Sequence, residues 1–414
     1  MKNKLLAAAS ALLLVGGVAA PAAIVFGATS AEAKNTVSAK VGKPLQEAQK
    51  LAQEKNFSGA LAKAKEADAV PGKTPYETFI VKDFLTYIYG QLRDFGNAAV
   101  AAEAALATGQ APAADVPRRI KLLAQLNYQA KNYGKAIQYA ERYNADYGAD
   151  TGMSELIAQS YYVQKNFAKA LSSSMDLVRS AERAGRSPNE DHLRLALSSA
   201  YNLKDNAQTK EVLFKLVQYY GKDDYWSDLF NILLAQTGNN ERSNLEFFRA
   251  KFAAGQMKDA DDYLEAGQTA IQVGFPGEAQ RIVQAGFDKG VLGTGPDASR
   301  HRRLQKLATD NATADKATIG AQAKAAAASP NGNIAVKVAE AMESYGDAAG
   351  ALTLIQSGIA KPGIKNMDEA RITLGRIQLA LGQKDAARKT FGEVKTDPKM
   401  QDAARLWTII SRKG

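Results

Sequence analysis

Apolar residues recur along most of this chain with the period of an α-helix, and the apolar stripes come in pairs separated by a short polar turn. The pair at about 151–184 shows this most clearly, with two successive stripes formed by Leu156, Ala158, Tyr161, Phe167, Ala170 and Leu171. Each pair therefore predicts two helices folded back on one another as a hairpin, with an apolar seam between them.

The turns between paired stripes resemble one another along the sequence. A seven-residue phrase at 55–61 recurs at 131–137 and 165–171, and a shorter echo occupies 94–98. The alanines within these phrases, at positions 60, 98, 136 and 170, are 38, 38 and 34 residues apart. A period of this size is typical of helical-repeat solenoids. The sequence therefore predicts a stack of about ten hairpins.

The clarity of this pattern varies along the chain and suggests an organisation. Residues 34–290 fit an array of about seven helix pairs. Residues 291–331 begin with a Gly-rich loop and continue into an Ala-rich segment with few large apolar residues, so we expect an atypical helical segment there. The repeat pattern returns in 332–414, where a last helix carrying Trp407 is expected to cap the stack.

The best-preserved unit resembles the tetratricopeptide repeat (TPR). The residues that match this repeat in type and spacing are Leu374, Gly375, Ala387, Phe391 and Pro398, with Ala158, Tyr161 and Ala170 in an earlier unit. The resemblance implies an all-α fold, a right-handed α-solenoid of stacked hairpins. It also implies a non-enzymatic scaffold that binds a protein or peptide partner.

The first 33 residues resemble a signal peptide. Lys2 and Lys4 precede an apolar stretch at 5–15, and an A-x-A site ends at Ala33, after which we expect cleavage. The prediction is export to a bacterial periplasm, and the alternative is an uncleaved leader that anchors the chain in the inner membrane. The chain has no cysteine, which excludes disulfides and a lipid-modified N-terminal Cys.

The formal net charge of +10 leaves two interpretations open. The excess either attracts an anionic envelope component or serves solubility at the surface. Four residues suit a phosphate or sulfate site, unless they simply form a solvated helix face: Arg300, Arg302, Arg303 and Lys306. Nucleic acid is not expected as a partner, because no aromatic residue is interleaved with this cluster.

The first helix of each hairpin supplies a candidate binding face, expected on the concave side of the stack. Residues three, four and seven positions apart share one side of a helix. The predicted partner-binding residues are Tyr87, Lys121, Gln125, Tyr128, Gln159, Tyr162, Arg194, Ser198, Tyr201, Asn202 and Asn231. Amides can donate to and accept from a peptide backbone, and tyrosines add apolar area with a polar tip. The alternative is that these are ordinary solvated positions.

Residues that could support catalysis or bind a metal or cofactor are sparse. The two histidines, His192 and His301, have no metal-ligand spacing. An acidic cluster at 259–265 falls on a helix expected to be exposed, where nothing raises a carboxyl pKa. We therefore predict no catalytic site, no metal and no cofactor. The rivals to a scaffold are an envelope factor that handles glycans or anionic lipids through the basic cluster, and a solenoid enzyme using Asp262.

Overall fold

A computed structural model describes residues 36–238 and 240–413 of the chain. Every regular element in these residues is helical, which confirms the predicted all-α solenoid of helix hairpins. The predicted leader and its cleavage site after Ala33 lie outside the described residues. Among the helices that are described, none is both long enough and apolar enough to cross a bilayer.

The chain divides into two compact units, and the boundary falls after Val212, within α10 (Asn206–Tyr219). We call them the N-terminal unit and the C-terminal unit and describe each by itself. The predicted domain boundaries at 290 and 331 stay predictions.

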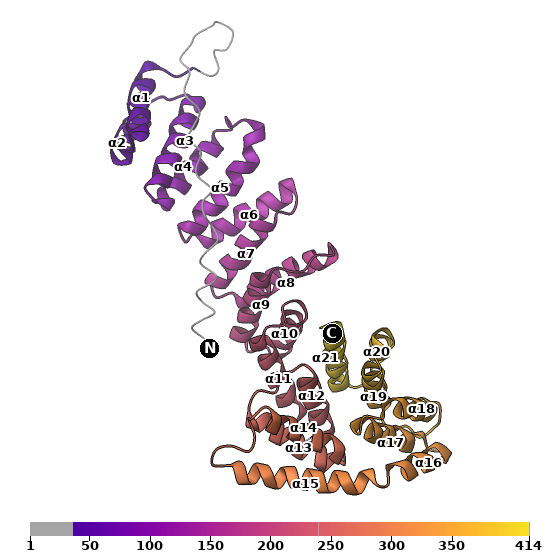
Figure 1. Ribbon diagram of the computed structural model, residues 1–414. Helices are drawn as coiled ribbons and strands as arrows, with labels where there is room; N and C mark the ends of the chain where they lie inside the picture. Colours follow the sequence, from indigo (N-terminus) through magenta and orange to yellow (C-terminus); the bar gives the residue numbers. More distant parts are fainter. Residues whose placement is uncertain (1–35, 239, 414) are drawn as a thin grey trace. The chain divides into compact units, whose positions relative to one another are not determined.

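The N-terminal unit is a stack of antiparallel helix pairs that lie side by side (Figure 1). Its helices are α1 (Ala39–Gln53), α2 (Phe57–Asp68), α3 (Pro75–Gln91), α4 (Phe95–Ala107), the short 3₁₀ helix η1 (Ala113–Asp115), α5 (Val116–Gln129), α6 (Tyr133–Tyr147), α7 (Thr151–Val163), α8 (Phe167–Arg183) and α9 (Glu190–Leu203). Each helix packs on the next, and α1 with α3, α5 with α7 and α7 with α9 are also in contact. Fully buried alanines at the repeated position allow this close approach, as at Ala60 and Ala136.

The turn inside each hairpin of the N-terminal unit has one geometry. The first helix ends in a residue with left-handed backbone, such as Lys131 with φ 63°. The next amide donates back to the last turn of that helix, as Asn132 does to the carbonyl of Asn127 at 2.8 Å. This is the Schellman arrangement that closes many helices. The following Asn or Asp then precedes the second helix, and Asp94 caps α4 by accepting from the amide of Asn97.

The C-terminal unit returns on itself. Its remaining helices are α11 (Asp223–Thr237), α12 (Glu241–Ala253), α13 (Ala260–Val273), α14 (Pro276–Asp288), α15 (Ala298–Lys316), α16 (Ile319–Ala328), α17 (Gly332–Ser344), α18 (Ala348–Ile359), α19 (Met367–Ala380), α20 (Lys384–Phe391) and α21 (Pro398–Lys413). Besides its sequence neighbours, α12 contacts α21, and α21 also contacts α19. The last helix thus packs against an early one as well as covering the end of the array.

The two cores differ in composition. Large side chains fill the C-terminal unit, where Trp226, Phe247 and Tyr263 are fully buried. The atypical helical segment at 291–331 also packs in this core, because α15 contacts both α13 and α14 and buries Leu304. Burial of aromatic side chains supplies much of the apolar area in a unit of this size.

Candidate functional site

Hydrogen bonds and ion pairs join the first helices of successive hairpins in the N-terminal unit. The Lys121 Nζ lies 2.6 Å from a carboxylate oxygen of Asp150, the residue that caps α7. The hydroxyls of Tyr162 and Ser198 are 2.7 Å apart and join α7 to α9. We call the surface formed by α3, α5, α7 and α9 the first-helix face. Its polar side chains fix each repeat against the next.

Several predicted binding residues are engaged in this way. Lys121 also lies over the ring of Tyr143, 4.5 Å from its centroid. The hydrogen bond to Asp150 raises the pKa of the Lys121 ammonium, so the cation is held in place. Tyr128 meets the edge of Tyr133, with ring centroids 5.5 Å apart, and burial raises the pKa of its phenol.

The remaining predicted residues occupy more varied positions. Tyr87 packs against Phe57 at a centroid distance of 6.4 Å, and Arg194 lies 3.6 Å from Asp191. Asn202 donates to the carbonyl of Ser198 at 2.8 Å. The other predicted positions are Gln125 and Gln159, which are half-buried, and Tyr201 and Asn231, which are exposed. Asn231 belongs to the C-terminal unit, whereas the other predicted positions belong to the N-terminal unit.

The basic cluster lies on α15 and is exposed to solvent. Lys306 pairs with Asp310 at 2.8 Å, and an Arg302 nitrogen lies 3.4 Å from the carbonyl of Gly293. His301 points the other way, is buried, and accepts from the amide of Gly293 through its Nδ1 at 3.1 Å. Anion binding at Arg300, Arg302, Arg303 and Lys306 stays a prediction.

The acidic cluster on α13 serves the fold. Asp259 caps the helix by accepting from the amide of Asp262 at 3.1 Å. Asp262 in turn pairs with Lys251 and accepts from the amide of Lys258. Among the residues that the structure describes, no three His, Cys, Asp or Glu side chains are grouped to hold a metal ion.

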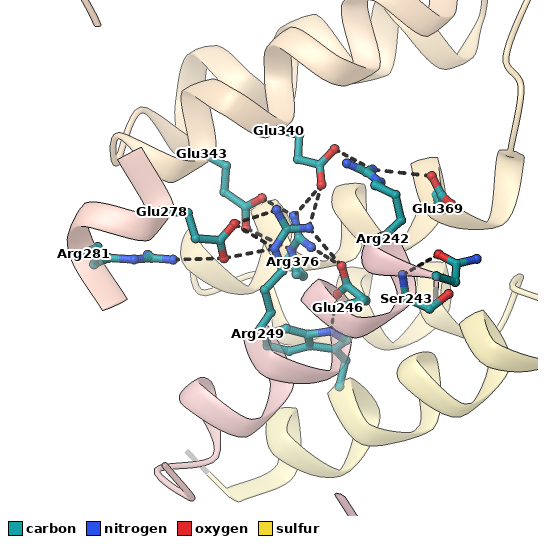
Figure 2. A network of polar contacts seen from close by, with 12 residues as sticks. Arg242, Ser243, Glu246, Arg249, Glu278, Arg281, Glu340, Glu343, Glu369 and Arg376 are labelled. Carbon is teal, nitrogen blue, oxygen red and sulfur yellow. Dashed lines mark hydrogen bonds and ion pairs between the residues drawn. The ribbon is translucent and has the colours of Figure 1, made fainter. Parts of the chain in front are cut away.

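A network of buried charges occupies the C-terminal unit, and sequence reasoning missed it. Figure 2 shows Arg249 of α12 and Arg376 of α19 among carboxylates from several helices. Arg249 contacts both oxygens of Glu278 at 2.6–3.0 Å and one oxygen of Glu340 at 2.6 Å. These contacts join α12 to α14 and α17.

Arg376 extends the network toward the end of the chain. It pairs with Glu343 at 2.7 Å and with Glu246 of α12. Glu246 also accepts a hydrogen bond from the indole N–H of Trp407 at 2.8 Å, which ties α21 to α12. On the other side, Arg242 bridges Glu340 and Glu369 at 2.9 and 3.4 Å. The packing of α12 on α21 therefore includes charge-assisted hydrogen bonds that are removed from water.

The carboxylates of this network respond differently to their surroundings. Burial alone would raise the pKa of Glu340, but the facing guanidiniums of Arg249, Arg242 and Arg376 lower it to about 2. For Glu343, burial outweighs the attraction of Arg376, and its pKa is raised. The network thus holds Glu340 firmly ionised, while Glu343 takes up a proton more readily than an exposed glutamate.

A cavity of about 390 Å³ opens beside the network. Its lining includes the charged side chains of Glu343 and Arg376 and the apolar side chains of Phe252, Leu379 and Trp407. Fixed charges beside apolar side chains can receive a side chain that has both characters. A signal was present in the sequence, because Glu246 and Arg249 interrupt an otherwise apolar run at 245–250.

Comparisons with known proteins give a likeness of fold only. No protein-family model matches the chain, and no curated protein matches it. Among solved structures, the chain is similar to one from the Naa15/Naa10 complex bound to HypK-THB, with 15% identity and a TM-score of 0.33 over 88% of this chain. The present chain spans 60% of that longer chain.

Two further solved structures are similar at the same level. One belongs to the APC/C hetero-tetramer Cut9-Hcn1, with 13% identity and a TM-score of 0.25, covering 86% of both chains. The other is yeast Tom70, with 10% identity and a TM-score of 0.24, covering 90% of this chain and 96% of that one. Its hairpins and Schellman turns make the described part of the chain a helical-repeat protein, whose units resemble the tetratricopeptide repeat.

Proposed function

We propose that this chain is a non-enzymatic scaffold that binds an extended segment of a partner protein along the first-helix face. The observation that carries the proposal concerns Gln125 of α5 and Gln159 of α7. Both amides are half-buried on successive first helices, and neither side chain has a hydrogen-bond partner among the described residues. A partly buried amide without a partner is available to a ligand's peptide group, which also donates and accepts.

The surroundings of these two amides support the same interpretation. The pairs Lys121–Asp150 and Tyr162–Ser198 fix the flanking side chains before any ligand arrives. A surface that is already ordered loses little conformational freedom on binding, so more of the contact energy appears as affinity.

Site-specific crosslinking tests the proposal. A photoreactive residue at position 125 or 159 of the full-length chain is expected to crosslink a partner protein in envelope extracts. The control carries the photoreactive residue in place of Gln138, which is exposed on the second helix α6. Equal crosslinking from position 138 would contradict docking on the first-helix face.

Affinity for a synthetic peptide of the crosslinked segment then provides the quantitative test. The double variant Q125A/Q159A removes two amides and is expected to weaken binding by roughly tenfold or more, at about 1 kcal/mol for each hydrogen bond. The matched variant Q138A/Q208A removes two amides from second helices and should bind like the wild type. An unchanged affinity of Q125A/Q159A contradicts the proposal.

We also propose that the scaffold works in a bacterial cell envelope. The support is the predicted leader, with its A-x-A site at Ala33. N-terminal sequencing of the protein purified from a bacterial periplasmic fraction is expected to begin at Lys34. Recovery of the chain only from the cytosol with its leader intact would overturn this part of the proposal.

A further inference from the structure

Five turns in the N-terminal unit place a cation where the backbone favours glycine. The residues with left-handed backbone at these turns, with φ between 56° and 63°, are Lys55, Arg93, Lys131, Lys165 and Lys204. They are the only non-glycine residues with positive φ in the described part of the chain, and all are basic. A side chain in this conformation strains the backbone, whereas glycine adopts it freely.

The C-terminal unit shows that this turn does not need a cation. The hairpin turns at Gly274, Gly346 and Gly382 close with the same backbone hydrogen bond as those of the N-terminal unit. The amide of Phe275, for example, donates to the carbonyl of Ala270 at 2.8 Å, as Asn166 does to Tyr161 at 2.9 Å. One chain thus uses glycine for this turn in one unit and a basic residue in the other.

The five cations are also unused inside the protein. Each is exposed, and none forms an ion pair with any residue that the structure describes. Some other basic residues of the same unit are paired, since Arg119 pairs with Asp83 and Lys135 with Glu103, while others such as Lys50 are also exposed without an ion pair among the described residues. Neither the backbone geometry nor an internal contact therefore accounts for the charge at these turns.

The cations follow one edge of the stack. Each occupies the tip of a hairpin, and the hairpins lie side by side (Figure 1). The cations recur once in each hairpin, after every second helix along the stack. Three large apolar side chains stand beside them, one or two residues earlier: Leu92, Val163 and Leu203, with exposures of 38%, 46% and 41%. We call these eight residues the turn edge.

We propose that the turn edge docks on a bilayer surface rich in anionic phospholipid. Basic side chains at the hairpin tips meet the phosphates, and the three apolar side chains enter the boundary between headgroups and acyl chains. Projecting tips suit a flat partner, whereas a peptide is more often held in a groove. The turn edge adjoins the first-helix face at the C-terminal ends of its helices, but it includes neither Gln125 nor Gln159, so the scaffold could hold a partner while lying on a membrane.

Vesicle sedimentation with the full-length protein tests the proposal. The variant K55G/R93G/K131G/K165G/K204G removes the charge and relieves the backbone strain, so its melting temperature should not fall. Its partition onto phosphatidylglycerol-rich vesicles is expected to drop by at least about tenfold, because each basic residue near an anionic surface contributes about fivefold. The wild type should bind these vesicles and dissociate from them at high salt, and it should not bind vesicles of pure phosphatidylcholine.

A charge-matched control separates the turn edge from general basicity. The variant K40Q/K43Q/K50Q/R183Q/R186Q removes five exposed positive charges from α1, α8 and the turn after α8, all in the N-terminal unit, and should bind vesicles like the wild type. Equal loss in both variants, or unchanged binding of the glycine variant, overturns the proposal. Failure of the wild type to bind vesicles while it binds soluble polyglutamate would instead assign the turn edge to an acidic protein.

The apolar part of the edge has its own test. The variant L92S/V163S/L203S is expected to weaken vesicle binding while leaving its salt dependence unchanged, since no charge is altered. The Q125A/Q159A variant should bind vesicles normally, so failure of membrane docking and failure of peptide docking can be told apart.

Discussion

A lysine with left-handed backbone gains nothing from that conformation itself. At Lys131, with φ 63°, the side chain crowds the backbone at a cost of about 1–2 kcal/mol that glycine avoids. Glycine loses more chain entropy on folding, which offsets about 0.5–1 kcal/mol of this gain. We therefore expect Lys131→Gly to raise the free energy of unfolding by about 0.5–1 kcal/mol, measured by urea denaturation.

Lys135, four residues later, provides the matched control. It lies in the first turn of α6 with helical backbone and bonds to Glu103 at 2.8 Å. Lys135→Gly should lower stability by about 0.5–1 kcal/mol. If both variants were destabilised, the backbone at position 131 would not be strained, and the lysine there would stabilise the fold itself.

Glu340 predicts how the C-terminal unit responds to acid. Its pKa falls from an ordinary 4.5 to about 2 in the folded chain. A carboxyl whose folded pKa is depressed adds stability above its unfolded pKa, and this is lost as the pH falls through the folded value. The difference corresponds to about 3 kcal/mol, lost between about pH 5 and pH 2.

The variant Glu340→Gln isolates this contribution. It should be less stable than the wild type at neutral pH, because Arg249 and Arg242 lose a charged partner. Its stability should then depend less steeply on pH between 5 and 2 in acid titrations followed by circular dichroism. If the stability of the two proteins changed equally with pH between 5 and 2, Glu340 would not titrate with a depressed pKa.

At the scale of the helix, local sequence carries most of the information. The apolar period predicts a hairpin at 151–184, and α7 and α8 occupy Thr151–Val163 and Phe167–Arg183. The packing of α12 on α21 could not be predicted in this way, because nothing in a local period specifies which distant helix covers an apolar face. The apolar run around Glu246 and Arg249 indicates that these two residues are buried, but it does not identify the residues with which they pair.

The candidate site was predictable to a similar degree. Helical spacing placed Lys121, Gln125 and Tyr128 on one helix, α5. It could not show that Lys121 already bonds to Asp150 of the next hairpin while Gln125 has no partner among the described residues. That distinction depends on how neighbouring repeats are set against each other, which is a property of packing.

Gly375 tests the packing inside the best-preserved hairpin. A Cβ at this position of α19 would lie 2.2 Å from the ring of Phe391, the last residue of α20. We expect Gly375→Ala to force the two helices apart and to lower the free energy of unfolding by about 1–3 kcal/mol. Gly320→Ala, in α16 with open space around the added carbon, should be neutral or stabilising. Similar effects of the two substitutions would mean that α19 and α20 are not in close contact.

At the scale of the whole chain, the two units should lose structure in different ways. Helices of the N-terminal unit contact near neighbours in sequence, so disturbance there should stay close to its origin. In the C-terminal unit, Arg249 connects α12 to α14 and α17, and Glu246 connects α12 to α19 and α21. Arg249→Met leaves three buried carboxylates short of a partner, at a cost of about 3–5 kcal/mol.

Hydrogen exchange measured by mass spectrometry can distinguish these behaviours. Arg249→Met should lower amide protection in α12, α17, α19 and α21 together, because the network couples the stabilities of these four helices. Protection in α1 to α6 should remain at the wild-type level. The control is Arg281→Met, whose exposed guanidinium lies 3.8 Å from Glu278 at the edge of the network, and a change within about 0.5 kcal/mol is expected. A loss of protection confined to α12 would contradict the argument, because the distant helices would then be held by apolar packing alone.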